Sequence, residues 1–294
     1  MAAAGRAGHT AGADAAGWSE VGPGCFARRY PSYDVTIGVV VGADGLLVVD
    51  TRASLGEADE LLADLRQLSS APVRWVVDTH WHFDHCFGNA RFDQAAIYGH
   101  ETVPPMLTEH GDTVSADLAE QSAEWAREMD AVVITPPDRT FSSVAVIDLG
   151  DRQVELVHPG RGHTSGDVVV RVPDADVVYA GDVVEESGPP SYGSDSYPLE
   201  WGPSLDVVAG LLTRQSAVVP GHGAVVDQGF VTEQRGEVGL VADTIRRLAA
   251  EGVPLARALD AAEWPFPPRV LGDAVRRGYA QLQDAGGRRT LPLV

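Results

Sequence analysis

The sequence predicts an α/β protein: a four-layer αββα sandwich, in which two mixed β-sheets pack face to face with helices outside. Two observations predict this class. Runs of β-branched residues occur in both halves of the chain, and helical patterns follow them in both halves. The chain has 294 residues, 44% of them hydrophobic, so it is long enough to bury a full core.

The first half of the chain alternates strand and helix signals. Residues 35–50 contain two β-branched runs joined by Gly-Ala-Asp-Gly, which predicts a hairpin. Residues 54–69 carry leucines at helical spacing, and Ser54 with Glu57 forms a capping-box pattern at the start. The apolar run 73–78 predicts a buried strand. The next expected elements are a short strand at 95–100 and helices at 101–110 and 114–130.

The second half repeats the order of strands followed by helices. Strands are expected at 141–148, 152–158, 167–172 and 176–181, and helices at 204–214, 229–250, 253–262 and 270–284. We expect residues 1–24, rich in Ala and Gly, to be a disordered tail, and residues 25–294 to form one domain that ends in C-terminal helices over about 229–284.

Composition excludes several function classes. The chain has 22 basic and 42 acidic residues, a formal net charge of −20, so nucleic acid is not an expected partner. Every basic residue is arginine, which excludes Schiff-base and P-loop chemistry because both need a lysine amine. Two cysteines form no metal or disulfide pattern, and neither a signal-peptide core nor a membrane-length apolar run is present. These features predict a cytoplasmic protein with a small-molecule substrate and no membrane partner.

A histidine-rich stretch follows the predicted strand at 73–78. Residues 79–89, "THWHFDHCFGN", place three histidines and an aspartate within six positions. Extended chain would point His80 and His82 the same way, and a turn at Asp84 and His85 would send two ligands to a neighbouring position. Three further imidazole or carboxylate ligands follow β-like runs beside glycines, namely His163, Asp182 and His222.

This ordered set of ligands, with the landmarks "GHTSGD", "GD" and "PGHG", resembles the metallo-β-lactamase superfamily over about residues 25–225. The resemblance implies two divalent metal ions, expected to be zinc, with iron or manganese as alternatives. It implies a first site of His80, His82 and His163, a second site of Asp84, His85 and His222, and Asp182 as the bridge between them. It also implies that Asp50 supports the motif loop through hydrogen bonds to ligands.

The chemistry implied by two such metals is hydrolysis. A hydroxide that bridges them would attack the carbonyl of an ester, lactone, thioester or amide, and Asp84 would orient it while acting as a ligand. Three alternatives stay open: a β-lactamase-like activity, a mononuclear iron oxygenase of the same fold, and a non-catalytic member that keeps the metal site.

A long Pro/Gly/Ser-rich loop over 185–201 follows Asp182 and suggests a substrate pocket. The expected lining residues are Trp81, Phe83, Glu185, Tyr192, Tyr197 and Trp201. The alternative is a packing loop whose aromatic residues fill the core. The apolar C-terminal helices either cover a sheet or form a homodimer face, with Leu255, Leu259, Trp264 and Phe266 as the residues concerned.

Overall fold

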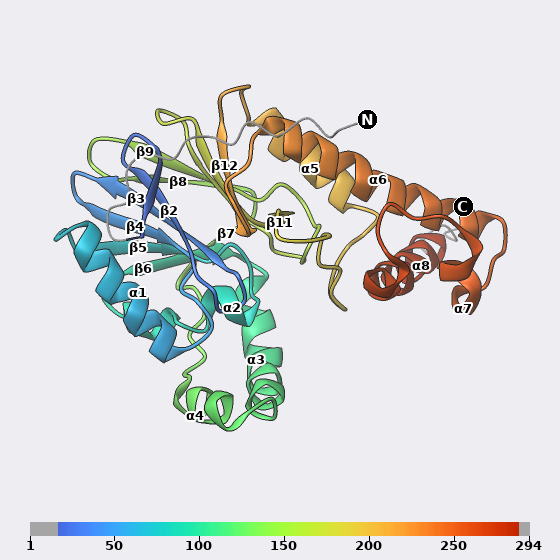
Figure 1. Ribbon diagram of the computed structural model, residues 1–294, viewed down its shortest axis with the longest axis horizontal. Coiled ribbons are helices and arrows are strands. Elements are labelled where there is room, and N and C mark those ends of the chain that lie inside the picture. The colour runs from blue at the N-terminus through green and yellow to red at the C-terminus, as the bar shows by residue number, and fades with distance from the viewer. Residues whose placement is uncertain (1–16, 288–294) are drawn as a thin grey trace, which may run out of the picture.

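The computed structural model describes residues 17–287, with side chains described as far as residue 284. Two β-sheets lie face to face, and helices cover their outer faces (Figure 1). The predicted αββα architecture is therefore confirmed. Both sheets are mixed, because each contains parallel and antiparallel neighbours.

The first sheet has seven strands in chain order: β1 (Ser19–Gly22), β2 (Cys25–Arg29), β3 (Thr36–Gly42), β4 (Gly45–Val49), β5 (Val73–Val77), β6 (Ala96–His100) and β7 (Arg139–Phe141). The second sheet has five strands in the order β12-β11-β10-β9-β8: β8 (Val144–Asp148), β9 (Gln153–Val157), β10 (Val169–Val172), β11 (Val177–Glu185) and β12 (Ala217–His222). Strands β4 to β7 run parallel, as do β11 and β12.

The helices fall into two groups on opposite sides of the sheets (Figure 1). The first group is α1 (Leu55–Leu68), α2 (Phe83–Cys86), α3 (Val103–Ala119) and α4 (Ala123–Ala131). The second is α5 (Trp201–Gly210), α6 (Gln228–Ala250), α7 (Leu255–Ala258) and α8 (Gly272–Gly287). Short 3₁₀ turns lie at η1 (Asn89–Phe92), η2 (Leu259–Ala261) and η3 (Pro268–Val270). Among these described helices, none combines the length and apolar character that a membrane crossing requires.

Three apolar layers hold the sandwich together. Buried side chains of both sheets form the layer between them, including Val40, Val77 and Tyr179. The outer face of the first sheet packs on α1, and the outer face of the second packs on α5, α6 and α8. Burial of so much aliphatic surface is the main stabilising contribution, and it fixes the strand ends that carry the polar site.

The first described residues correct part of the expectation of a disordered tail over 1–24. Residues 1–16 lie outside the described residues, but Ser19–Gly22 forms β1 and pairs with β2. Trp18 is fully buried, and its indole Nε1 donates to the carbonyl of Asp64 at 3.3 Å. Trp18 stands alone among small and polar residues, so the sequence showed no periodic pattern that would predict its burial.

Other element boundaries also differ from the predictions. The expected strand at 141–148 is divided, because β7 belongs to the first sheet and β8 to the second. The expected helix at 114–130 is also divided, since α3 runs to Ala119 and Ser122 caps α4 by accepting from the Trp125 amide at 3.1 Å. The predicted Ser54 cap of α1 is confirmed, with the Glu57 amide donating to its hydroxyl at 3.2 Å.

The C-terminal helices cover the five-stranded sheet. Phe266 is buried in that layer, and Leu259 and Trp264 pack against it, whereas Leu255 is exposed. Three of the four apolar residues considered for a dimer face are thus used inside the chain, and a homodimer stays a prediction.

Candidate metal centre

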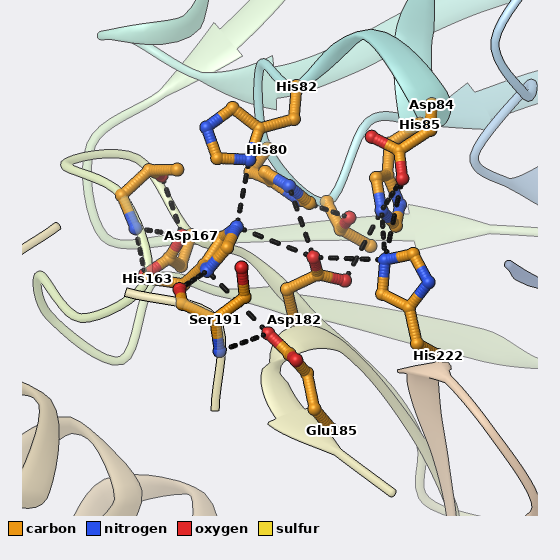
Figure 2. A network of polar contacts seen from close by, with 12 residues as sticks. His80, His82, Asp84, His85, His163, Asp167, Asp182, Glu185, Ser191 and His222 are labelled. Carbon is orange, nitrogen blue, oxygen red and sulfur yellow. Dashed lines mark hydrogen bonds and ion pairs between the residues drawn. The ribbon is translucent and has the colours of Figure 1, made fainter. Parts of the chain in front are cut away.

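The site lies at the strand ends of both sheets (Figure 2). The loop after β5 carries His80 and His82, and the short helix α2 carries Asp84 and His85. The loop after β9 carries His163, β11 carries Asp182, and β12 ends at His222. The structure brings together all seven predicted ligands. They form two groups, each with ligand atoms within 4.8 Å of one another: His80, His82, His163 and Asp182 in one, and Asp84, His85 and His222 in the other.

Local backbone features hold these ligands in place. Gly181 precedes Asp182 with a φ of +52°, and a Cβ there would lie 2.7 Å from the Thr79 side chain. Only glycine adopts this left-handed conformation against a neighbouring loop without strain. On the "GHTSGD" loop, the Asp167 carboxylate accepts from the Thr164 amide at 2.9 Å and from its hydroxyl at 2.6 Å, which closes a tight turn around His163.

Asp182 occupies the centre of the cluster. Its Oδ2 lies 3.7 Å from Nε2 of His80 and 3.4 Å from Nε2 of His163. The same carboxylate reaches the other group, with Oδ1 3.2 Å from Nε2 of His85 and Oδ2 3.2 Å from Nε2 of His222. One buried carboxylate therefore contacts imidazoles of both groups.

Two of the imidazoles are oriented by backbone carbonyls. The Nδ1 atom of His163 lies 3.0 Å from the carbonyl oxygen of Ser191, and Nδ1 of His222 lies 2.8 Å from that of Tyr33. Because a carbonyl can only accept, Nδ1 carries the proton in both rings. In the neutral rings, Nε2 then presents a lone pair to the centre of the site.

Two further imidazoles are oriented by carboxylates. Asp50 lies 2.8 Å from Nδ1 of His85, and Asp195 lies 3.2 Å from Nε2 of His82. A carboxylate accepts, so each ring donates outward and directs its other nitrogen inward. Outward hydrogen bonds of this kind are typical of histidines that bind metal.

The inward nitrogens face one another at short distance. His163 Nε2 lies 2.8 Å from His82 Nδ1, and His85 Nε2 lies 3.3 Å from His222 Nε2. Two lone pairs repel at such distances unless a proton or a metal cation lies between them. In addition, His80 Nε2 is buried with no hydrogen-bond partner among the described residues. The residues present therefore fit cation binding at this point.

Burial and mutual charge divide the imidazoles into two kinds. Burial lowers the pKa of His80 well below its usual value and that of His163 to about 4, so both favour the neutral form that binds metal. Burial also lowers the pKa of His85 and His222, but the combined effect of the Asp182 and Asp84 carboxylates outweighs it and raises the pKa of both, that of His222 to about 9. Asp182, whose charge stabilises these protonated imidazoles, is therefore also placed to bind a metal ion.

Asp50 fixes the start of the motif loop. It is 1% exposed, has a φ of +67°, and follows β4 directly. Its carboxylate accepts from the Thr79 amide at 2.7 Å and from the Thr79 hydroxyl at 2.9 Å, in addition to its contact with His85. These contacts are the support that the sequence led us to expect of Asp50.

A cavity of about 640 Å³ opens onto the two ligand groups. Of the predicted lining residues, Trp81, Phe83 and Glu185 do line it. The expectation for the other three was wrong. Trp201 is fully buried, with its Nε1 donating to the Val183 carbonyl at 3.1 Å.

The other two misassigned aromatic residues also pack away from the cavity. The Tyr192 ring lies 5.0 Å from that of Trp201, inside the core under the second sheet. Tyr197 lies under two guanidinium groups, with Arg161 at 4.3 Å and Arg277 at 5.3 Å from the ring centroid. Tyr192 and Trp201 of the loop over 185–201 thus fill core, the alternative that composition had left open, whereas Tyr197 is half-buried against the two arginines.

Sequence reasoning missed several cavity residues, among them Tyr33, Val114 and Asp195. Tyr33 has a φ of +53° and lies in the turn before β3, where "PSYD" signals a turn but no partner. Val114 belongs to α3, and the amphipathic pattern of that helix does not show that Val114 faces a cavity. Asp195 lies in the loop of 185–201, where acidic residues are common and carry no motif.

We expect Asp195→Asn to weaken metal binding by about 10- to 100-fold, the usual cost of losing a carboxylate that orients a ligand. Asp195 accepts from Trp81 Nε1 at 2.8 Å as well as from His82, so it fixes two neighbouring rings. Competition with a zinc-binding dye measures the affinity. The matched control is Asp273→Asn, since Asp273 pairs with Arg276 on the surface of α8. Equal affinities for both variants would contradict this role.

The αββα sandwich with histidine and aspartate clusters at its strand ends defines a class of metal-binding fold, and comparison with known proteins gives the family. The family model described as "Metallo-beta-lactamase superfamily" matches residues 32–222. The chain belongs to the metallo-beta-lactamase superfamily.

Individual relatives are distant. A "Metallo-beta-lactamase type 2" of Bacillus cereus is 27% identical over 189 residues, which cover 64% of this chain and 66% of that protein. An "Acyl-coenzyme A thioesterase MBLAC2" of Bos taurus is 30% identical over 161 residues, which cover 50% of this chain and 57% of that protein. The match thus spans less than two thirds of the length of these relatives.

Solved structures show the same fold. A metallo-beta-lactamase from Pontibacter korlensis superposes with a TM-score of 0.61 at 19% identity, covering 75% of this chain and 97% of that one. The sec-alkylsulfatase Pisa1 from Pseudomonas sp. superposes with a TM-score of 0.72 at 13% identity, covering 95% of this chain and 52% of that one. The fold shared with Pisa1 therefore extends over more of this chain than the fold shared with the Pontibacter korlensis protein.

Proposed function

We propose that this chain is a dinuclear metal-dependent hydrolase that acts on the ester, lactone, thioester or amide carbonyl of a small molecule. The observation that carries the proposal is the inward orientation of five imidazoles, each with its other nitrogen engaged outside the cluster or against the motif loop. Such an arrangement is stable only around cations, and it opens onto a cavity of substrate size.

The proposal assigns two metal positions. His80, His82 and His163 would hold the first ion, and Asp84, His85 and His222 the second, with Asp182 shared. The contacts of Asp182 with imidazoles of both groups support the sharing. Imidazole and carboxylate without thiolate suit zinc, and they also accept iron or manganese.

Bound divalent ions would supply an acidified water molecule and a polarising charge for the carbonyl oxygen. The side chains supply the positioning. Asp84 lines the cavity, and its Oδ2 lies 3.5 Å from Nε2 of His222. In that position its carboxylate can orient a nucleophilic water molecule and accept a hydrogen bond or a proton from it. Trp81 and Phe83 form an apolar wall beside it and exclude bulk water from the substrate.

The test is reconstitution with zinc, manganese or iron, followed by metal analysis and assay with aryl esters, acyl-lactones, thioesters and nitrocefin. We expect two zinc ions per chain and hydrolysis of at least one class, lost in both His82→Ala and Asp84→Ala. The matched control is Asp206→Ala, because Asp206 pairs with Arg235 on the surface. One iron per chain, or two metals without any turnover, would contradict the proposal and favour the oxygenase or the non-catalytic alternative.

Zinc is also expected to stabilise the fold. A ligand at 100 times its Kd adds about 2.7 kcal/mol to the free energy of unfolding, which corresponds to a rise in Tm of about 5–10 °C for a domain of this size. Differential scanning fluorimetry with zinc, with magnesium and with a chelator measures the shift. Magnesium is the control because it prefers oxygen ligands. The same Tm in all three conditions would rule out a metal site in the folded protein.

A further inference from the structure

Outside the proposed metal ligands, the walls of the cavity carry no basic side chain. Among the described residues that line it, none is arginine, and the whole chain contains no lysine. The ionisable lining groups outside the proposed ligands are Glu185, Asp195 and Tyr33. Glu185 accepts from the Ser191 amide at 3.0 Å and is almost fully buried. Away from the metal centre, an anionic group on a substrate would therefore meet no basic side chain on these walls.

Two arginines illustrate other uses of these side chains. Arg29 makes a two-point ion pair with Asp34, in which its Nη2 lies 2.7 Å from Oδ2. Arg269 lines a separate hollow together with Tyr192 and Asp273. Neither residue lines the cavity at the metal centre.

A second groove next to the cavity is lined by acidic side chains. It shares Glu185, Gly188 and Pro189 with the cavity, and it is also lined by Glu186, Glu233 and Glu237. Among the described residues, none that lines this groove is basic. An anion that approaches from this side would therefore meet no basic side chain of the described residues in the groove either.

The remaining wall is apolar and aromatic. Trp81, Phe83 and Val114 line it, and the Tyr33 ring packs edge-on against Phe83 with centroids 4.8 Å apart. Flat aromatic surface of this kind favours aliphatic or aromatic groups over hydrated ions, because transfer of an unpaired charge to such a surface is costly.

On these grounds we infer that the site takes substrates whose part beyond the reacting carbonyl is uncharged and apolar, and that it discriminates against substrates with an anionic group there. The inference rests on the proposed hydrolase function.

The test compares two hydroxamates with the same metal-binding head. Hexanohydroxamic acid ends in a methyl group, and adipic monohydroxamic acid carries a carboxylate at that place. Calorimetry on the zinc-loaded chain is expected to show the methyl-ended compound binding about tenfold tighter or more, with a difference that shrinks as salt rises. Equal or tighter binding of the carboxylate-ended compound would overturn the inference. Because this readout is binding, failure of the chain to hydrolyse any ester would refute the proposed function separately.

A charge-introducing variant sharpens the test. Gly188 lies on the cavity wall, its φ is outside the left-handed region, and a Cβ there meets no atom within 4 Å. We expect Gly188→Arg to improve binding of the carboxylate-ended hydroxamate about tenfold while the methyl-ended compound changes little. Gly188→Gln is the uncharged control of similar length. A preference for the methyl end that stays the same in Gly188→Arg would show that charge does not set the selectivity.

Discussion

Asp182→Asn is expected to lower kcat/KM by about 10³-fold and to reduce the zinc content below two ions per chain. The carboxylate lies 3.2–3.7 Å from imidazole nitrogens of both ligand groups, so it is placed between the two proposed metal positions. A charge pair near 4 Å contributes about 4 kcal/mol at an effective dielectric constant of about 20, and about 1.4 kcal/mol is a factor of ten. Asparagine keeps the shape and removes the charge.

Metal analysis and steady-state kinetics on the same preparation measure both effects. Asp206→Asn is the matched control, since it removes a carboxylate from an exposed ion pair with Arg235. Circular dichroism establishes that both variants are folded. Full zinc content and full activity in Asp182→Asn would show that Asp182 does not bridge two metals.

Trp201→Ala is expected to destabilise the fold by about 3–5 kcal/mol, the usual range for removal of a large buried aromatic residue. Trp201 is fully buried between the second sheet and its helices, and its Nε1 donates to Val183 at 3.1 Å. The loss corresponds to a fall in Tm on the order of 10 °C for a domain of this size. Thermal and urea unfolding measure it.

Trp201→Phe separates packing from the hydrogen bond, and we expect it to cost about 1–2 kcal/mol. Trp201 packs against His163, with ring centroids 5.7 Å apart, so it supports a ligand without contacting the cavity. Unchanged stability together with an altered KM in this variant would instead indicate that Trp201 lines the substrate pocket, as the sequence predicted.

The layered fold could be predicted because periodicity and turn residues are local signals. The hairpin at 35–50 and the helix at 54–69 match β3, β4 and α1 closely. Edge elements could not be predicted in the same way. Strand β1 is four residues long and half exposed, and its position depends on Trp18 packing under a distant helix. Whether β7 and β8 join different sheets is likewise decided by tertiary packing.

The metal centre could be predicted because its ligands are of a few residue types at fixed spacing in sequence. All seven predicted ligands converge in the structure. The substrate cavity could not be predicted as well, because aromatic residues serve cores and pockets equally. Trp81 and Phe83 were placed correctly by their position within the motif, whereas Tyr192, Tyr197 and Trp201 had only loop composition to support them. Asp195 lacked any pattern at all.

Anomalous diffraction at the zinc absorption edge, from crystals grown with excess zinc, tests the central claim most directly. The proposed arrangement predicts two strong peaks about 3.5–4 Å apart, the spacing typical of dinuclear hydrolase sites. One peak should lie among His80, His82 and His163, the other among Asp84, His85 and His222, with Asp182 next to both. A map with no peak among these seven side chains would contradict the claim.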